Sequence, residues 1–534
     1  MMLPFVLASA LVAPSIVNAA SSIGLPPSLP KYSKTLNKDF LGLSIEMDRW
    51  TSWAGAAVGQ PNPFVNQVLS NLASLTGSAV PLRVGANSED RGLLEPNQQV
   101  ANVTFPAPTP LVPYPEAEHI GIGRDFYALS QNLPDGTSFT WGINLRINNR
   151  TETVGQATQL HDTFYGSTKQ ALSKVSLNTI EIGNEWSHLI SPPCVTEQID
   201  FYNNAQLRRS YPGYDIFAYA KQWADFGGQV VDLFSKESRG PKLQIGAYVD
   251  YPNYVWTPPA TFGTGVLDTK AGKNLDNFCA HNYQASKGGV FMNNATTDPK
   301  SGALMARANT RGSIARHSQA AAQSKDVGLE YVLGESNSYA NHGVPGISDS
   351  AEAAIWLLDF GLNAAANGIA RMFMHEGVGF AYNLIQPVAI QGSNPTTRPK
   401  IQAPYYGAVM VNEAIGTGKD TKVAELTTNS SKVAAHGIWE GDRLMRVAVV
   451  NNQVYLPGMN RTIETIDIQG YAGDRKVSIK RFTPPSANAT QGLTWGGVSY
   501  EAADGKPTGQ VVEQWLNGTS FTMQATEAVL LCFK

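Results

Sequence analysis

The chain has 534 residues, more than a single hydrophobic core usually organises, so two domains are expected. Hydrophobic residues make up 43% of it and charged residues 16%, a composition typical of a globular protein with a large core. The 40 Lys and Arg against 43 Asp and Glu leave a net charge of -3, which argues against nucleic acid or a strongly anionic polymer as the main partner.

The N-terminus is typical of an exported protein. Residues 1–19 are apolar and carry no acid, and small residues precede Ala20; this pattern predicts a cleaved signal peptide, with a membrane anchor as the alternative. No other apolar run approaches the roughly 20 residues of a membrane span. Seven Asn-x-Ser/Thr triplets fit a secreted protein with N-linked glycans, at Asn102, Asn149, Asn294, Asn429, Asn460, Asn488 and Asn517.

Strand and helix patterns then alternate over residues 39–416. The predicted strands are 40–46, 79–85, 139–145, 180–185, 243–249, 277–283, one ending at 335, and 371–376. The predicted helices lie near 63–75, 155–174, 216–235, 303–322 and 351–366. Eight strands that alternate with helices predict an α/β fold, a (β/α)8 TIM barrel.

After about residue 421 the pattern changes to short alternating segments separated by Gly, Asn and Pro. They are 433–439, 444–450, 463–468, 477–482, 511–515 and 528–533. This spacing predicts an antiparallel β-sandwich, to which residues 20–38 are expected to add a strand. The predicted organisation is a signal peptide (1–19), an N-terminal segment (20–38), a catalytic barrel (39–416) and a β-sandwich domain (417–534).

Two of the predicted barrel strands end in a glutamate. TIEIGNEW, residues 179–186, brings Asn184 and Glu185 to the end of strand four, and YVLGES, residues 331–336, brings Glu335 to the end of strand seven. In a TIM barrel the C-terminal ends of the strands build the active site. Glycosidic bond cleavage needs one carboxyl group to protonate the leaving oxygen and a second to attack the anomeric carbon or activate water. The pair therefore predicts glycosidase chemistry, with solvated rim residues as the alternative.

The motifs EIGNEW, FCAHNYQ and VLGESNSYANHG resemble glycoside hydrolase family 79, the β-glucuronidases and heparanases, and most of all its secreted fungal β-glucuronidases. The resemblance covers nearly the whole chain after the predicted signal peptide. It implies that Glu185 is the general acid/base and Glu335 the nucleophile of a retaining enzyme, with carboxyl groups about 5 to 5.5 Å apart. The implied substrate is a glycan such as arabinogalactan, from which terminal β-linked glucuronic acid or its 4-O-methyl form is removed.

The same resemblance implies which residues bind the sugar. Tyr283 is expected to hydrogen-bond the nucleophile and Glu46 to bind sugar hydroxyls, while the position of Asn184 beside Glu185 already places its amide to bond the 2-hydroxyl. The carboxylate of glucuronic acid is expected to meet tyrosine hydroxyls and backbone N–H groups, and the matching positions are Tyr339, Gly379 and Tyr382.

Other interpretations remain open at this stage. Glu46 is alternatively paired with Arg83, Tyr283 and Tyr382 are alternatively core aromatics, and His281 and His375 are expected to hydrogen-bond to the catalytic groups. No cofactor is indicated, and the candidate ligands lack zinc-like spacing, so no metal site is expected. Three cysteines, Cys194, Cys279 and Cys532, allow at most one disulfide. The competing functions are an endo-acting, heparanase-like enzyme and an inactive carbohydrate-binding protein on the same scaffold.

Overall fold

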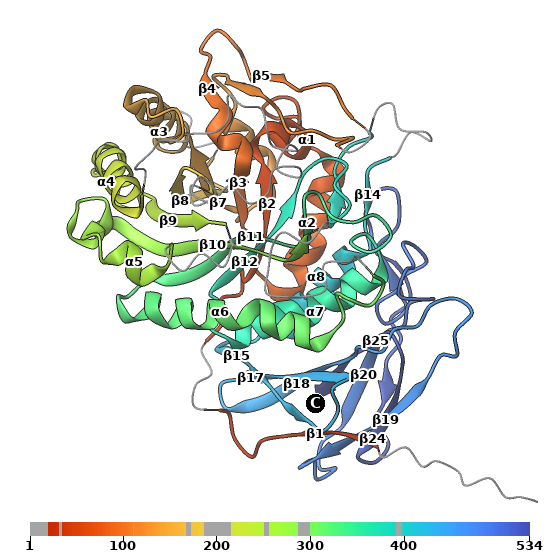
Figure 1. Cartoon of the computed structure of the whole chain (residues 1–534). Helices are drawn as coiled ribbons and strands as arrows, with labels where there is room; N and C mark the ends of the chain where they lie inside the picture. Colours follow the sequence, from red (N-terminus) through yellow and green to blue (C-terminus); the bar gives the residue numbers. More distant parts are fainter. Residues whose placement is uncertain are drawn as a thin grey trace, which may run out of the picture.

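The computed structural model describes residues 20–30, 35–109, 112–166, 172–185, 215–249, 256–286, 300–390 and 398–534. The predicted signal peptide, Cys194 and the Asn294 triplet lie outside these ranges. A closed barrel occupies the upper left of Figure 1, and a β-sandwich, in blue, lies below and to the right of it. Across the described ranges, no helix is long and apolar enough to cross a membrane.

Eight parallel strands form the barrel. They are β2 (Leu41–Glu46), β3 (Leu82–Gly85), β7 (Ser138–Ile143), β8 (Ser176–Ile182), β9 (Lys242–Tyr248), β10 (Leu275–Ser286), β11 (Glu330–Ala340) and β12 (Arg371–Glu376). Each strand pairs with the next of these in chain order, and β12 pairs with β2 to close the sheet. The predicted TIM barrel is therefore confirmed.

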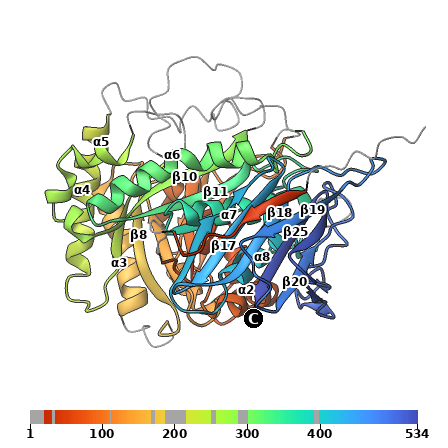
Figure 2. The same ribbon diagram turned by 90° about the horizontal axis from the view of Figure 1, so that it is seen from below.

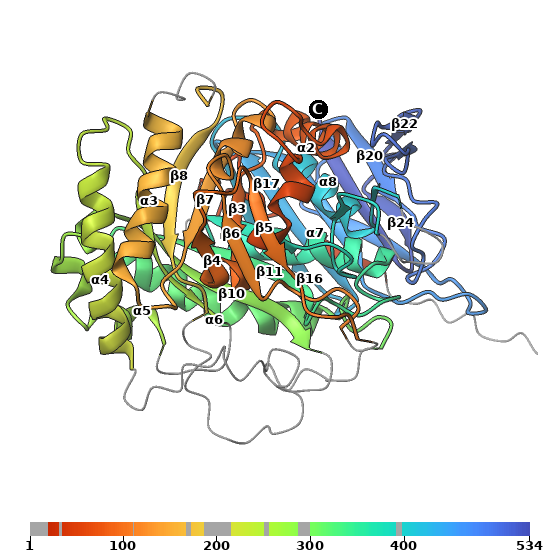
Figure 3. The ribbon, with the colours of Figure 1, turned by 90° about the horizontal axis from the view of Figure 1, so that it is seen from above.

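Helices surround this sheet. The longer ones are α2 (Pro63–Thr76), α3 (Arg150–Tyr165), α4 (Ile216–Leu233), α6 (Arg307–Asp326), α7 (Ala351–Ala366) and α8 (Pro404–Ile415), and the short ones are α1 (Trp50–Ala54) and α5 (Pro258–Phe262). Short 3-10 helices are Met47–Arg49, Ala86–Arg91, Tyr127–Asn132, Val266–Asp268 and Gly272–Asn274. Figure 3 shows α3 and α4 at the end of the molecule farthest from the sandwich.

Local sequence signals set the helix ends. Asn62 caps α2 by accepting hydrogen bonds from the N–H groups of Phe64 and Val65, and Gly77, at φ +73°, ends it. α3 begins five residues earlier than predicted, because the side chain of Asn149 accepts hydrogen bonds from the first turn and starts the helix at Arg150. The structure thus corrects the predicted start of this helix.

The sandwich consists of two sheets. The six-stranded sheet has the order β15 (Thr421–Glu425), β17 (Val433–Glu440), β18 (Arg443–Asn451), β25 (Glu527–Phe533), β20 (Val477–Phe482) and β23 (Gln514–Trp515). The four-stranded sheet has the order β16 (Thr427–Thr428), β1 (Ser21–Gly24), β19 (Ile463–Gln469) and β24 (Ser520–Gln524). Ile23, Trp439 and Leu531 belong to the apolar core between them.

Small sheets complete the fold. β4 (Gly92–Leu94), β6 (His119–Ile122) and β5 (Ala101–Thr104) form a three-stranded sheet, whose β4 and β5 lie on the side of the barrel away from the sandwich in Figure 1. Two further pairs are β13 (Ile385–Gln386) with β14 (Lys400–Ile401), and β21 (Val498–Ser499) with β22 (Thr508–Gly509).

Barrel and sandwich meet along α6, α7 and α8: α7 packs beside β15 and β17, and α8 packs beside β18 (Figure 2). Asp359 of α7 is buried there, with Arg311 Nη1 of α6 at 2.6 Å and His436 Nε2 of β17 at 2.8 Å. Arg311 also pairs with Glu425 of β15 at 2.8 Å. These ion pairs fix the sandwich against the helices, so the sandwich braces the side of the barrel that carries β11 and β12.

Candidate active site

Two glutamates meet at the C-terminal ends of the barrel strands. Glu185 follows β8, and Glu335 lies within β11. One carboxylate oxygen of Glu185, one of Glu335 and a ring nitrogen of His281 all lie within 4.8 Å of one another. His281 Nδ1 is 2.8 Å from Glu185 Oε1 and 3.8 Å from Glu335 Oε2. Only 11% of the Glu185 side chain and 6% of the Glu335 side chain are exposed to solvent. The separation fits a retaining glycosidase, in which the carboxyl groups stand roughly 5–5.5 Å apart.

The backbone at Glu185 is strained. Glu185 has φ +50°, and its N–H donates to the carbonyl of Ala247, itself at φ +49° on the neighbouring strand β9. A residue other than glycine in this left-handed region costs roughly 1–3 kcal/mol, and such residues cluster at functional sites. The strain turns the chain sharply at the end of β8 and leaves the Glu185 carboxylate beside His281.

Arg83, buried on β3, connects the two catalytic candidates. Its Nη1 donates to Glu335 Oε2 at 3.1 Å and to Ser44 Oγ at 2.8 Å, and its Nη2 donates to Asn184 Oδ1 at 2.7 Å. The bond to Arg83 fixes the amide of Asn184 with its Nδ2 toward Asn87 Oδ1, 3.1 Å away. Arg83 therefore orients both the nucleophile candidate and the amide predicted to meet the 2-hydroxyl.

Positive charges keep Glu335 ionised. Burial alone would raise the pKa of Glu335, but the charges of His375 and His281, together with Arg83, outweigh it and lower the pKa. The Tyr283 hydroxyl donates to Glu335 Oε1, and burial followed by the charge of Glu335 raises the pKa of Tyr283, which stays a donor. Glu335 is accordingly an anion held by two donors, as a nucleophile requires. The same positive charges disfavour a cation between Glu185 and Glu335.

Glu46 is paired with a histidine and not with Arg83. His375 Nε2 lies 3.2 Å from Glu46 Oε1, and the Ser88 N–H donates to Glu46 Oε2 at 3.1 Å. Burial would lower the pKa of His375, yet Glu335 and Glu46 raise it to about 9. The alternative of a Glu46–Arg83 pair is wrong, because the guanidinium is already bonded to Glu335, Glu181 and Asn184.

The residues predicted to meet a sugar carboxylate fall into two groups. The Tyr382 ring lies with its centroid 6.0 Å from that of Tyr283 and 5.9 Å from that of His375, so it shares the nucleophile's pocket. Tyr339, by contrast, is part of the main hydrophobic core, and burial, with Glu352, raises the pKa of its phenol to about 12. Contact between Tyr339 and substrate stays a prediction.

Gly379 lies in the turn after β12. Its φ is +83°, and a Cβ there would come within 2.4 Å of the Tyr114 ring, so only glycine fits. Its N–H donates to Gln386 Oε1 at 2.8 Å. A substrate carboxylate would have to replace this amide acceptor.

A second group of polar residues was not predicted from the sequence. Glu116 lies 3.0 Å from Arg91 Nη1 and 3.5 Å from His342 Nε2; burial would raise its pKa, but Arg91 and His342 lower it to about 2. The His342 ring stacks on Phe380 with centroids 3.7 Å apart. His342 belongs to the motif VLGESNSYANHG, and this was the one signal for the group, because Glu116 precedes β6 in a segment without periodicity.

Glu89 was also not predicted from the sequence. It is fully buried beside Glu181, whose hydrogen-bond partners are Arg83 and Gln244. Burial raises the pKa of Glu89 well above its usual value, and the neighbouring Glu181 raises it further. The raised pKa favours the neutral acid, whose proton is placed to be donated to Glu181. Glycines make room for it, since a Cβ at Gly85 or Gly142 would lie 2.2 or 1.8 Å from Glu89 Oε2.

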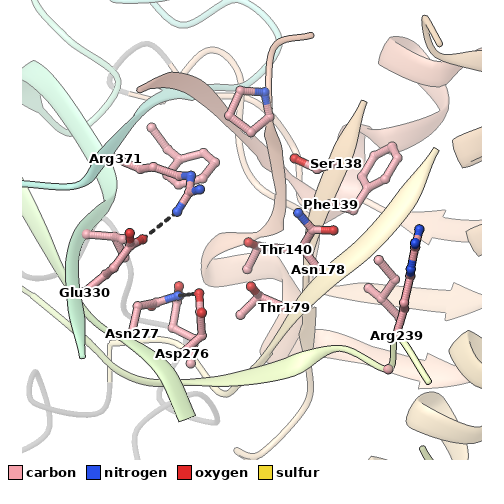
Figure 4. Close-up of a pocket in the computed structure, with 16 residues that line it drawn as sticks. Ser138, Phe139, Thr140, Asn178, Thr179, Arg239, Asp276, Asn277, Glu330 and Arg371 are labelled. Carbon is pink, nitrogen blue, oxygen red and sulfur yellow. Dashed lines mark hydrogen bonds and ion pairs between the residues drawn. The ribbon is translucent and has the colours of Figure 1, made fainter. Parts of the chain in front are cut away.

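A polar cavity of about 350 Å³ lies at the opposite, N-terminal mouth of the barrel (Figure 4). Arg371 and Glu330 form an ion pair of 2.6 Å in it, and Asn277 Nδ2 donates to Asp276 Oδ2 at 3.1 Å. In barrel enzymes this face serves stability, whereas catalysis takes place at the other face. The cavity does not include Glu185 or Glu335.

Comparisons with known proteins agree with this geometry. Residues 435–530 match the glycosyl hydrolase family 79 C-terminal beta domain. A β-glucuronidase from Aspergillus niger is 30% identical over 92% of this chain and 88% of its own length. The chain belongs to glycoside hydrolase family 79. The predicted family and the predicted enzyme class, a glycoside hydrolase, are thereby confirmed.

A second curated relative and a solved structure are also similar to the chain. A β-glucuronidase from Neurospora crassa is 27% identical over 92% of this chain and 90% of its own length. The solved structure of a 4-O-α-L-rhamnosyl-β-D-glucuronidase from Fusarium oxysporum, at 23% identity and a TM-score of 0.75, covers 96% of this chain and all of that chain. The shared fold extends over barrel and sandwich.

Proposed function

We propose that this family 79 hydrolase is an exo-acting, retaining β-glucuronidase that removes terminal β-linked glucuronic acid, or its 4-O-methyl form, from glycans such as arabinogalactan. The observation that carries the proposal is the Glu185–Glu335 pair, with oxygens within 4.8 Å and Glu335 held as an anion by Arg83 and Tyr283. The substrate class is supported by the relatives named β-glucuronidase.

The geometry supports double displacement. Glu335 attacks the anomeric carbon while Glu185 protonates the glycosidic oxygen, so the bond between anomeric carbon and aglycone breaks as a glycosyl ester forms. Glu185 then removes a proton from water, which attacks the ester and frees glucuronic acid and Glu335. His281, hydrogen-bonded to Glu185 Oε1, keeps the acid/base group in position through both steps.

Sugar recognition in this proposal uses the remaining predicted residues. Glu46 and the Asn184 amide bind hydroxyl groups, and Tyr382, beside Tyr283, donates its hydroxyl to the sugar carboxylate. The predicted signal peptide implies that the enzyme acts outside the cell. Secretion is part of the proposal and is tested by the presence of the active enzyme, cut before residue 20, in the culture medium.

The deciding experiment is the hydrolysis of p-nitrophenyl β-glucuronide beside the matching glucoside and galactoside, with Glu335→Gln as the control. Turnover of the glucuronide alone, lost in the variant, is expected. Cleavage of the neutral glycosides instead would contradict the substrate, and no turnover of any of the three would contradict an exo-acting enzyme.

Retention is tested separately. Proton NMR during hydrolysis is expected to show the β-anomer of glucuronic acid first. Glu185→Ala is expected to lower kcat about 10²- to 10⁴-fold on substrates with poor leaving groups and much less on p-nitrophenol, which leaves without acid catalysis. Initial release of the α-anomer would contradict Glu335 as nucleophile.

A further inference from the structure

An apolar strip is exposed at one edge of the sandwich. Val511 is 64% exposed, Val512 54% and Trp515 53%, three large hydrophobic side chains within five residues. They lie in and just before β23, the last strand in the order of the six-stranded sheet. Exposed hydrophobic edge strands invite unwanted pairing with other chains, and native proteins cover or interrupt them. We therefore expect another group to cover this strip.

The Asn517 triplet follows directly after the strip. Leu516 packs against the sandwich core, and its N–H donates to the Val477 carbonyl at 2.9 Å, so the chain continues the strand pairing there. Side chains alternate between faces in such an extended segment. Trp515 and Asn517, on either side of the inward Leu516, consequently point outward together. Asn517 is exposed, and Gly518 at φ +80° turns the chain into β24.

Four of the other described triplets have their asparagine in a hydrogen bond, among them Asn102, which donates to Glu95 Oε2 at 3.3 Å, whereas the exposed Asn460, like Asn517, has none among the described residues. Asn149 is engaged as the cap of α3, Asn429 accepts from the Ser22 N–H at 2.7 Å, and Asn488 accepts from the Ser486 hydroxyl at 2.8 Å. Within the described part of the chain no hydrogen bond engages the Asn517 side chain. Of the seven triplets, Asn517 alone has an aromatic residue two positions before the asparagine.

From these features we infer that Asn517 carries an N-linked glycan whose first N-acetylglucosamine packs on the Trp515 indole and covers the apolar strip. The carbon-bound hydrogens of a pyranose ring form an apolar face that suits an aromatic ring. In the joining reaction Asn517 Nδ2 loses a proton and bonds to C1 of the sugar, and the lipid diphosphate of the oligosaccharide donor leaves. The inference rests on the proposed export, since that donor acts in the secretory pathway.

The test compares four chains secreted from a eukaryotic host: the wild type, Thr519→Ala, Trp515→Ala and the double variant. Thr519→Ala removes the triplet but keeps Asn517, and glycopeptide mass spectrometry measures occupancy. In the wild-type background, loss of the glycan is expected to lower Tm by about 2–4 °C, the shift that a contact of ordinary strength produces. In the Trp515→Ala background the same loss is expected to leave Tm unchanged. Thr104→Ala, which removes the Asn102 triplet, is the matched control without an aromatic partner.

Four results would overturn the inference. If Asn517 is unmodified while other triplets carry glycans, the inference about Asn517 is wrong and the proposed export stands. If no triplet carries a glycan, both the inference and the proposed export are wrong. Equal Tm shifts in the two backgrounds refute the contact with Trp515. If light scattering shows a dimer that Trp515→Ala dissolves, the strip is a contact between two copies of the chain instead.

Discussion

Two buried carboxylates in this enzyme have the same kinds of neighbours and different arrangements of them. Asp359, between barrel and sandwich, bonds directly to Arg311 at 2.6 Å and to His436 at 2.8 Å. Glu335, in the active site, bonds to Arg83 at 3.1 Å, while its two histidines stand 3.8 Å away.

The longer distances have a cause. His281 is hydrogen-bonded to Glu185, and His375 is paired with Glu46, so both histidines are held by other carboxylates. Their charge lowers the pKa of Glu335 without occupying its oxygens. Asp359 is the opposite case: burial would raise its pKa, and Arg311 with His436 lowers it by direct bonds. Asp359 bonds directly to both of its basic neighbours, whereas Glu335 bonds directly to Arg83 and keeps its charge with the help of two more distant histidines, which leave it able to react.

Glu335→Gln should show the catalytic role of Glu335, as opposed to the structural role of Asp359, with the largest effect. The amide cannot attack the anomeric carbon, so kcat is expected to fall at least about 10³-fold, the scale on which loss of a nucleophile is felt. Initial rates on p-nitrophenyl β-glucuronide measure this, with circular dichroism as the check on folding. A loss below tenfold would show that Glu335 is not the nucleophile.

Asp359→Asn should do the reverse. It removes the carboxylate that Arg311 and His436 share and leaves Arg311 with Glu425 alone, and breaking a buried pair costs about 3 kcal/mol or more. A lower Tm with unchanged kcat per folded molecule is expected in thermal unfolding and activity assays. Asp225→Asn, which removes an exposed partner of Arg150, is the matched control and should change Tm little. A lower kcat in Asp359→Asn would contradict a purely structural role.

His375→Gln should act on the pH dependence. Loss of its charge raises the pKa of Glu335, so the acid limb of kcat/KM against pH is expected to move up by about one unit. The pKa of His375 is raised to about 9 from an ordinary value near 6.5. Its pairing therefore stabilises the fold fully below about pH 6.5 and loses this effect as the pH rises through about 9.

The measurement is the difference in free energy of unfolding between the wild type and His375→Gln at several pH values. It should be largest near pH 6 and vanish near pH 10. A difference that grows with pH would mean that the histidine is neutral in the folded enzyme.

Substitutions of Glu89 are expected to have the smallest effect on kcat/KM, and they distinguish a neutral from an ionised carboxyl group. Glu89→Gln keeps a donor to Glu181, so kcat/KM is expected to stay within about threefold of the wild type, whereas Glu89→Ala loses a hydrogen bond to a charged group, worth roughly 1.5–3 kcal/mol, and should lower kcat/KM about tenfold or more. Equal losses in both variants would show that Glu89 must be ionised.

The fold was predictable where its signals are local. The alternation of strand and helix patterns indicated all eight barrel strands, and strand-end motifs indicated Glu185 and Glu335, because a strand and its last residue are neighbours in sequence. The start of α3 was also encoded, by Asn149 with Glu152 three residues later, a capping signal that the apolar periodicity hid.

The rest of the site depends on tertiary neighbours. Nothing local indicates that Glu89 fits between Gly85 and Gly142, since these residues meet only when β3 and β7 pair. The pairing of Glu46 with His375 likewise requires closure of the barrel between β2 and β12, which places the first strand beside the last.

The strand β1 has a consequence for the order in which the protein is made. Ser21 and Ile466 are paired in parallel strands, and the Ser21 hydroxyl donates to Glu464, 443 positions away. Domains tend to fold in the order in which the ribosome releases them, and contacts so distant in sequence form slowly. The barrel can thus assemble while the first strand waits, and the sandwich closes only after synthesis has delivered its last strands. The sandwich can consequently fold only after both β1 and β25 have been synthesised and have paired with their neighbouring strands.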